Sequence, residues 1–313
     1  MPAVSVVVAT RNRAPRLRAL LLSLIAQTLP RDRFEVIVVD DASSDATPSV
    51  LARADGVRVI RRDVNEGPAA ARNDGWRAAR APLVAFIDDD CEADPEWLIA
   101  GLAACAEHPG AVVQGRVDPH PAEAHLRSPF ARTLTVHGDG PYYQTANIFY
   151  PRALLERLGG FDARSYPVPG GEDTDLAWRA IEAGAPTAYA DAARAYHAVS
   201  VIGARGRLRV AARWSQTLHV YRRHPGARKR VFTRGVFWKP WHYTLARASL
   251  ALVVPRRFRY LRGWLAAPYL DSIRVRLRHE RGRVWHAPFY LVEDAVEIAA
   301  AVRASIRHRM LVL

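Results

Sequence analysis

The sequence predicts an α/β fold in which a mostly parallel sheet is flanked by helices. Short apolar runs rich in β-branched residues alternate with helical segments through residues 1–200, and this alternation is typical of parallel sheets with helical crossovers. Two of the runs lead directly into aspartates, Asp40-Asp41 and Asp88-Asp89-Asp90. Because ligands of open α/β sheets bind beyond the carboxyl ends of the strands, the same pattern predicts a binding site.

Four buried strands are expected early in the chain, at residues 4–9, 34–39, 57–61 and 83–87. A first helix is expected over residues 16–27, where leucines at 17, 20, 21 and 24 follow the spacing of one helix face. Three further helices are expected, over 45–54 after a capping segment, over the Ala-rich stretch 69–80, and from Asp94 with Pro95 in the first turn.

The rest of the α/β part is expected to contain strands at 112–117, 144–150 and 187–190. One helix is expected over 152–158, ended by Gly159-Gly160, and another from Glu172 onward. Residues 120–143 have no clear period. We expect them to form loops and edge structure that face a second substrate.

The three carboxylates Asp88, Asp89 and Asp90 follow the strand at 83–87 without a break. Adjacent acids repel one another, and their burial is unfavourable without a cation. Mg²⁺ and Mn²⁺ take oxygen ligands of this kind and often share them with substrate phosphates. The residues therefore indicate a site for a metal and a diphosphate; the alternative is a solvated acidic turn.

A second acidic strand end strengthens the metal–diphosphate interpretation. Asp41 follows the strand at 34–39, and consecutive parallel strands have their carboxyl ends on one edge of the sheet. An acid there can accept hydrogen bonds from a ribose or a base. Arg72, on the helix between the two acidic strand ends, can bind a phosphate with two parallel hydrogen bonds.

Glu172 and Asp173 are expected in the first turn of a helix, where the helix dipole favours an ionised carboxylate. Such a carboxylate over a sugar pocket could act as a general base, although many acids in first turns are structural. His197 lies where the α/β part ends. Neutral imidazole is a good ligand for Mn²⁺ and similar ions, and the alternative is an ordinary packed or surface histidine.

The charge is unevenly distributed, with a formal net value of +14. Residues 1–199 contain 21 Lys and Arg against 26 Asp and Glu, whereas residues 200–313 contain 24 against 5. The basic part is expected to meet an anionic partner.

The two cysteines, Cys91 and Cys105, indicate a reducing compartment. Since neither a signal peptide nor a spanning apolar run is visible, we expect a cytoplasmic location.

Together these segments resemble the family-2 glycosyltransferases, which are inverting enzymes of the GT-A fold that use nucleotide-sugars. The resemblance covers about residues 1–200. Its motifs are Val4–Arg13, Val38–Asp45, Asn65–Gly75, Phe86–Asp90, Gly159–Asp162, Glu172–Arg179 and His197. It implies a GT-A type, Rossmann-like sheet and an activity in EC class 2.4, and it does not specify the sugar.

The resemblance also implies roles for matching residues. Asp41 corresponds to an acid that contacts the base or ribose, and Ala9, Arg11 and Arg72 lie in or near that pocket. Asp88 and Asp90 match the Asp-x-Asp motif, with Asp90 the direct metal ligand. Asp173 matches the catalytic base, with Glu172 as the second candidate. His197 matches a histidine that completes the metal shell in some members.

The sequence thus predicts an inverting transfer of a sugar from a nucleoside-diphosphate-sugar to a hydroxyl acceptor, with Mn²⁺ or Mg²⁺ and a UDP-sugar as the default donor. Two alternatives stay open at this point. A sugar-phosphate nucleotidyltransferase also uses acids around a metal, but the Gly-rich loop of that class is absent near residues 9–13. A non-enzymatic polyanion binder is indicated only by charge, and we expect no nucleic-acid partner because no such motif is present.

The predicted division places a glycosyltransferase domain at residues 1–204 and a basic, aromatic-rich helical extension at 205–313. One helix is expected over 205–223.

Tryptophans and tyrosines among arginines are typical of membrane interfaces, so we expect the extension to associate peripherally with the inner face of the cell membrane. A solvated basic face and polyanion binding are the alternatives. A cell-envelope glycan or lipid-linked acceptor would fit a membrane location; the sugar, base, acceptor and oligomeric state are not encoded in any readable motif.

Overall fold

The computed structural model describes residues 1–313, apart from the side chain of Gln216. The chain forms two compact units. The first unit consists of residues 1–124 and 133–198, and the second consists of residues 125–132 and 199–313. The functional boundary predicted at 204/205 stays a prediction, because compactness alone does not define a domain.

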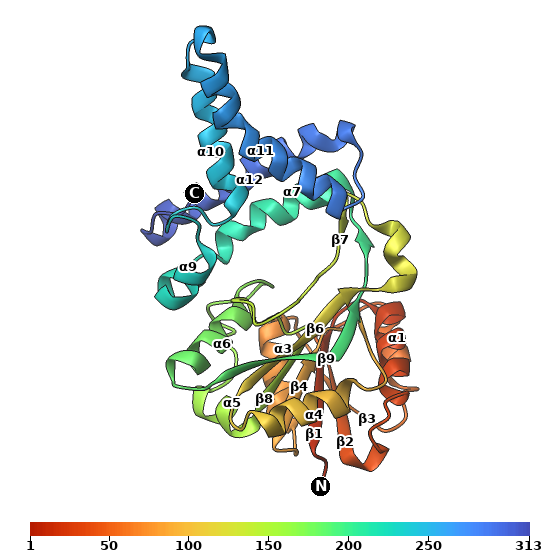
Figure 1. Ribbon diagram of the computed structural model, residues 1–313. Helices are drawn as coiled ribbons and strands as arrows, with labels where there is room; N and C mark the ends of the chain where they lie inside the picture. Colours follow the sequence, from red (N-terminus) through yellow and green to blue (C-terminus); the bar gives the residue numbers. More distant parts are fainter. The chain divides into compact units, whose positions relative to one another are not determined.

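The first unit is built on an eight-stranded sheet with the order β3-β2-β1-β4-β8-β6-β9-β5 (Figure 1). The strands are β1 (Val4–Thr10), β2 (Phe34–Asp40), β3 (Val57–Arg61), β4 (Leu83–Ile87), β5 (Cys91–Ala93), β6 (Val112–Pro119), β8 (Asn147–Pro151) and β9 (Thr187–His197). Strands β3, β2, β1 and β4 are parallel neighbours, and β6 is parallel to β9. Strand β8 is antiparallel to β4 and β6, and β5 is antiparallel to β9. The predicted mostly parallel sheet is confirmed.

Helices cover both faces of this sheet (Figure 1). They are α1 (Ala14–Ile25), α2 (Thr47–Leu51), α3 (Pro68–Ala78), α4 (Trp97–Glu107), α5 (Arg152–Leu158) and α6 (Glu172–Glu182). Side chains alternate between the two faces because successive residues of a strand point in opposite directions. Val6 and Val8 pack in the cluster that α1 and α4 complete, whereas Val7 packs in the cluster completed by α3, α5 and α6.

Several predicted boundaries were wrong for local reasons. The short strand expected at 187–190 is the start of a longer strand, β9, whose register with β6 shifts between Gly115 and Arg116. The helix expected from Asp94 begins at Trp97, and Asp94 Oδ1 instead accepts the Glu96 N–H at 3.1 Å. The three-residue strand β5 was missed because so short a segment has no readable period.

The second unit consists mainly of helices. They are α7 (Gly203–Arg213), α8 (Val220–Arg223), α9 (Pro225–Val231), α10 (Pro240–Val253), α11 (Arg259–His279) and α12 (Ala287–His308), with a small sheet of β7 (Ala131–Arg132) and β10 (Ser200–Val201). The single helix expected over 205–223 was wrong, because a 3₁₀ turn at Trp214–Gln216 separates α7 from α8. Among the described helices, none combines the length and apolar character needed to cross a bilayer.

Buried ion pairs hold the second unit together. Glu293 pairs with Arg207 at 2.8 Å, and Asp294 accepts two hydrogen bonds of 2.7 Å from Arg276. Glu297 pairs with Lys239 and with His242 Nε2, the latter at 3.1 Å. These three acids are buried, whereas most arginines of the unit are not, so the exterior of the unit is mainly basic.

We expect Gly75→Ala to lower the free energy of unfolding by about 1–3 kcal/mol. A Cβ at this position of α3 would overlap Val7 Cγ1 of β1 and approach Val39 Cγ2 of β2 at 3.3 Å. The sign is diagnostic, because Gly→Ala within a helix is otherwise stabilising. Denaturant unfolding measures the change. Gly140→Ala is the control, since a Cβ there meets nothing within 4 Å; equal stability of the two variants would show that α3 is not in close contact with the sheet.

We expect Glu297→Gln to destabilise the protein by ~3 kcal/mol at pH 7, because it leaves the largely buried Lys239 ammonium without its counter-charge. Although burial opposes ionisation, Lys239 and His242 lower the pKa of Glu297 to about 2 from its ordinary 4.5. A lowered pKa means that the ionised group stabilises the fold above pH 4.5 and loses this effect as the pH falls towards 2. The gap between wild type and variant should therefore shrink below pH 4.5.

Asp271→Asn serves as the control for Glu297→Gln, because Asp271 is an exposed acid of the same unit. Chemical denaturation of the three proteins at pH 7 and pH 3.5 measures the effect. A pH-independent difference, or a difference no larger than that of the control, would contradict the assignment.

Candidate active site

The carboxyl ends of three adjacent strands bring the predicted acids to one edge of the sheet. Strand β1 lies between β2 and β4. The Asp41 N–H donates to Thr10 O at 2.9 Å, and Thr10 Oγ1 donates to Asp89 Oδ2 at 2.8 Å. Thr10, at the end of β1, thus bonds to both acidic strand ends.

Each of the three consecutive aspartates has a different set of partners. Asp88 Oδ1 accepts a hydrogen bond from Arg72 Nη2 at 2.7 Å. Asp89 is buried, and its burial raises its pKa to about 7 despite the nearby Arg13. Asp90 forms an ion pair with Arg13, and its Oδ1 lies 3.5 Å from His197 Nε2. Arg13 also lies 3.3 Å from Asp89, so cations and hydrogen-bond donors together reduce the repulsion among the three carboxylates.

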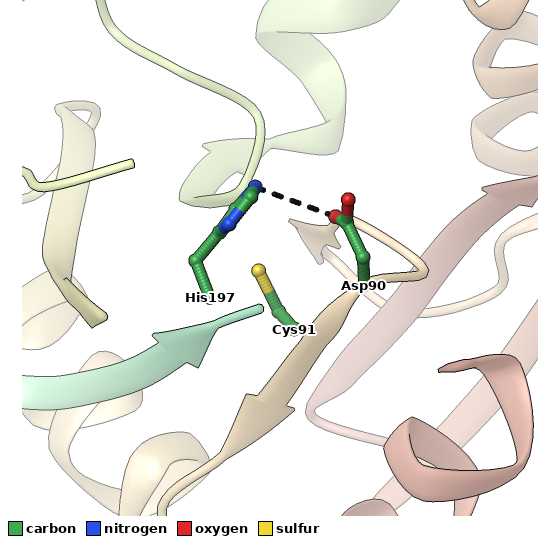
Figure 2. Close-up of side chains that lie close together, drawn as sticks. All are labelled: Asp90, Cys91 and His197. Atoms are coloured by element: carbon green, nitrogen blue, oxygen red, sulfur yellow. Dashed lines mark ion pairs between the residues drawn. The ribbon is translucent and has the colours of Figure 1, made fainter. Parts of the chain in front are cut away.

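Asp90, Cys91 and His197 form a compact group in which one ligand atom of each residue lies within 4.8 Å of the others (Figure 2). The antiparallel pairing of β5 with β9 places Cys91 opposite His197. His197 Nδ1 lies 2.8 Å from the Ala198 carbonyl oxygen, which can only accept a hydrogen bond. We therefore assign a proton to Nδ1, and Nε2 is the ring nitrogen that faces Asp90 and could bind a cation.

The donors of this group fit a divalent cation. Burial opposes the ionisation of Asp90, but His197 and Arg13 lower its pKa, so its carboxylate is charged. An anionic oxygen and a neutral imidazole nitrogen suit Mn²⁺. Burial raises the pKa of the Cys91 thiol well above its usual value. Cys91 is therefore a neutral thiol, and Asp90 and His197 are the residues that could hold the ion.

Arg72 connects the strand-end acids to the start of α6. It is buried, and its guanidinium donates to Asp88 at 2.7 Å and to Glu172 Oε1 at 3.1 Å. Its pKa is raised because the nearby carboxylates, Asp88 first, outweigh the opposing effect of burial. The predicted contact of Arg72 with a phosphate stays a prediction, since the structure shows the guanidinium engaged by carboxylates.

Glu172 and Asp173 have different environments although they are neighbours. Glu172 is buried and uses both oxygens, one for Arg72 and the other for the Gly170 N–H at 2.6 Å. Among the described residues, only the Thr174 N–H donates to Asp173, at 2.8 Å. Burial raises the pKa of Asp173 to about 7, and the Glu172 charge adds to this effect. Asp173 is thus the carboxylate with an oxygen available and a pKa near neutrality.

Asp41 has a structural role that the sequence did not reveal. Its two oxygens accept the N–H groups of Gly67 at 2.9 Å and Glu66 at 3.2 Å, just before α3 begins. Gly67 has φ +89°, and a Cβ there would lie 2.6 Å from the Pro167 carbonyl oxygen, so only glycine fits. Burial raises the pKa of Asp41 in spite of these N–H groups and Arg62.

The nucleotide-pocket residues of the prediction lie beside this acid in the sheet. Ala9 pairs with Val39 near the end of β1, and its side chain is half-buried. Arg11 follows β1 and is exposed, and its charge acts on Asp41. Their contacts with a nucleotide stay predictions.

Sequence reasoning missed Arg13 and Thr10 as members of the site. Arg13 Nη1 lies 3.3 Å from Asp89 Oδ1 and also pairs with Asp90, although 76 residues separate it from the first of these acids. Their position in the sequence could have identified them as site residues. Both residues follow or end an apolar strand, as the aspartates do, and a basic residue at the same sheet edge is a natural partner for them.

A comparison with protein families identifies the first part of the chain. The model of the family described as Glycosyl transferase family 2 matches residues 5–159. This range includes Asp41, Arg72 and Asp88–Asp90 but not Asp173 or His197, whose assignment therefore depends on geometry.

Curated relatives of known name are glycosyltransferases. The chain is 34% identical over 224 residues to the validoxylamine A glucosyltransferase of Streptomyces hygroscopicus subsp. jinggangensis, covering 59% of this chain and 53% of that one. It is 33% identical over 212 residues to the pre-mycofactocin glycosyltransferase of Mycobacterium tuberculosis, covering 62% of this chain and 42% of that one. The chain thus spans about half the length of these relatives.

Solved structures with the same fold are also glycosyltransferases. The mannosyltransferase PcManGT of Pyrobaculum calidifontis, solved with GDP-Man and Mn²⁺, superposes with a TM-score of 0.60 at 23% identity, covering 98% of this chain and 87% of that one. S. aureus TarS residues 1–349, solved with UDP, superposes with a TM-score of 0.53 at 22% identity, covering 99% and 92%. The predicted GT-A fold is confirmed, and residues 5–159 form a domain of Glycosyl transferase family 2.

Proposed function

We propose that this protein transfers a sugar from a nucleoside-diphosphate-sugar to a hydroxyl acceptor with inversion at the anomeric carbon. One observation carries the proposal. The charged carboxylate of Asp90 lies beside the imidazole of His197. Arg72 pairs with Asp88, near Asp90 in the sequence, and with Glu172, next to Asp173. Asp173 is a carboxylate of near-neutral pKa. A cation site and a base at one sheet edge are the two groups that this reaction needs.

Asp90 and His197 would hold the divalent cation, Mn²⁺ or Mg²⁺, with Asp88 as a further carboxylate beside it. A bound cation would stabilise the charge that develops on the departing diphosphate. The imidazole favours Mn²⁺, because Mg²⁺ prefers oxygen ligands. The Mn²⁺ bound by PcManGT and by a GalNAc transferase of the same fold supports this choice.

Asp173 would act as the general base. It accepts the proton of the acceptor hydroxyl while the acceptor oxygen bonds to the anomeric carbon, and the bond from that carbon to the diphosphate oxygen breaks with its electron pair. A pKa near 7 suits this task, because about half of the base is ionised at neutral pH and the ionised form accepts a proton readily. Glu172 is the weaker candidate, because Arg72 and the Gly170 N–H occupy its oxygens.

Asp41, Ala9, Arg11 and Arg72 would form the nucleotide side of the site. The structures with UDP and with GDP-Man show that this fold accepts either base, and we retain UDP as the default. Arg72 has a positioning role in addition, since one guanidinium orients both Asp88 and the residue before the base.

We further propose that the protein works at the inner face of the cell membrane on a lipid-linked or cell-envelope acceptor. Support comes from the second unit, in which three of the five acids are buried and most arginines are not. An outward basic surface is attracted to the anionic cytoplasmic leaflet.

Asp173→Asn should lower sugar transfer by about 10²–10⁴-fold, because a general base contributes that much. Nucleotide binding should persist, which thermal shift with UDP and Mn²⁺ measures. Asp55→Asn is the matched control, since it removes an exposed carboxylate of the same unit. Transfer by Asp173→Asn at a near-normal rate would remove Asp173 from this role.

The pH profile tests the same base independently. Because Asp173 must be ionised and its pKa is raised to about 7, kcat/KM of the wild type should fall about tenfold per pH unit below pH 7 and level off above it. Unfolding temperatures over the same range control for loss of structure. A profile that is flat down to pH 5 would contradict a base of near-neutral pKa.

Asp90→Ala and His197→Ala should each weaken Mn²⁺ binding by at least about tenfold, because each removes a ligand. The electron paramagnetic resonance signal of free Mn²⁺ measures this in the presence of UDP and without any turnover. Cys91→Ala should bind Mn²⁺ like the wild type, since the thiol is neutral. Loss of binding in Cys91→Ala alone would transfer the ligand role to sulfur.

A further inference from the structure

The connection between α10 and α11 exposes an unusual number of apolar side chains. We define the hairpin tip as residues 250–264. Leu252 and Tyr260 each expose 79% of their surface, and Val253 exposes 80%. Four more large hydrophobic residues of the tip are exposed by 45–63%: Leu250, Phe258, Leu261 and Trp264. Contiguous apolar surface of this kind marks an interaction site.

The base of the hairpin is held firmly, whereas its tip is not covered by another helix of the second unit. Tyr269 and Ile273 of α11 pack against Tyr290 of α12, and Arg276 pairs with Asp294. Helices α10 and α11 lie side by side along the hairpin, and within this unit their connection lies at the end away from α12 (Figure 1). The exposed residues are thus presented on a supported element.

The tip is also strongly basic. It contains Arg256, Arg257, Arg259 and Arg262, and no acidic residue occurs between positions 240 and 270. The arginines of the hairpin lie against aromatic rings. Arg257 is 4.9 Å from the Phe258 ring centre, Arg259 is 5.0 Å from that of Tyr260, and Arg247 is 4.0 Å from that of Trp264. The cations and the apolar side chains therefore belong to one surface.

The combination of charge and apolar surface distinguishes the possible partners. A second copy of this chain at the tip would bring two sets of arginines together without acids to neutralise them. A polyanion would pair with the arginines but leave the aliphatic side chains in water. An anionic lipid bilayer meets both needs, because apolar side chains bury at the acyl boundary while arginines bind headgroup phosphates.

We propose that the hairpin tip inserts into the interface of an anionic phospholipid bilayer and anchors the protein there. The proposal rests on the membrane association proposed above and names the surface responsible for it. Burial is interfacial only, since no described helix can span the bilayer. Trp264 and Tyr260, beside arginines, have the amphipathic character of residues at headgroup level.

Flotation with vesicles of phosphatidylcholine and phosphatidylglycerol (3:1), compared with phosphatidylcholine alone, tests the proposal. The wild type should bind the anionic vesicles more strongly. Leu252→Ser/Val253→Ser should lower the partition coefficient by at least about tenfold, because two exposed side chains no longer bury apolar surface. Arg256→Gln/Arg257→Gln should lower it by about fivefold for each arginine.

Ile306→Ser is the matched control, because Ile306 lies in the same unit and exposes 77% of its surface outside the tip. It should bind vesicles like the wild type. A second readout reports insertion directly. Both native cysteines are buried, so Val253→Cys can be labelled selectively with an environment-sensitive fluorophore, whose emission should shift to the blue on anionic vesicles.

The outcomes separate this proposal from the others. Vesicle binding without a fluorophore shift, or with an unaffected Leu252→Ser/Val253→Ser variant, would overturn the tip assignment and leave membrane association in place. Absence of vesicle binding would overturn both. Concentration-dependent dimerisation that the double Ser variant abolishes would identify a second copy as the partner. Sugar transfer to a soluble acceptor should be unchanged in the tip variants, so these results do not depend on the catalytic assignment.

Discussion

The site is organised by the repulsion among three consecutive carboxylates at the end of β4. Three adjacent acids cannot all stay ionised and partly buried without opposite charge or hydrogen-bond donors. The partners are Arg72 for Asp88, the Thr10 hydroxyl for Asp89, and His197 for Asp90, while Arg13 pairs with both Asp89 and Asp90. These partners come from β1, the residues that follow it, α3 and β9, so the charge at one strand end determines which parts of the first unit must meet there.

Arg72 extends this organisation to the proposed base. Its guanidinium binds Asp88 on one side and Glu172 on the other, so the residue next to Asp173 is held by the same cation as the strand-end acid. A buried pair of this kind is valuable for geometry rather than for stability, since desolvation offsets much of its attraction. With Glu172 engaged, the adjacent Asp173 has both the free oxygen and the raised pKa that a base requires.

The second unit uses charge in the opposite way. Glu293, Asp294 and Glu297 are buried against basic residues, which join α7, α10, α11 and α12 into one body. These three acids are used internally, and most arginines of the unit are not buried. A basic exterior is therefore a consequence of how the unit is held together, and the hairpin tip adds apolar side chains to it.

Sequence alone determined the strands β1 to β4, because buried parallel strands carry a strong local apolar signal. It also determined the acids at the ends of these strands, since the strand order places their carboxyl ends together. These motifs were enough to indicate the family of the domain. Only the tertiary structure decided which acids are free. The partners of Asp88, Asp90 and Glu172 lie 16 to 107 residues away along the chain. The periodicity of a sequence does not indicate such distant contacts. Only the folded chain therefore shows that Asp173 has an available oxygen, which donors surround His197, and that the hairpin tip is exposed. The physical reason is that a carboxylate's charge and pKa depend on its three-dimensional neighbours, whereas a strand's existence depends largely on its own residues.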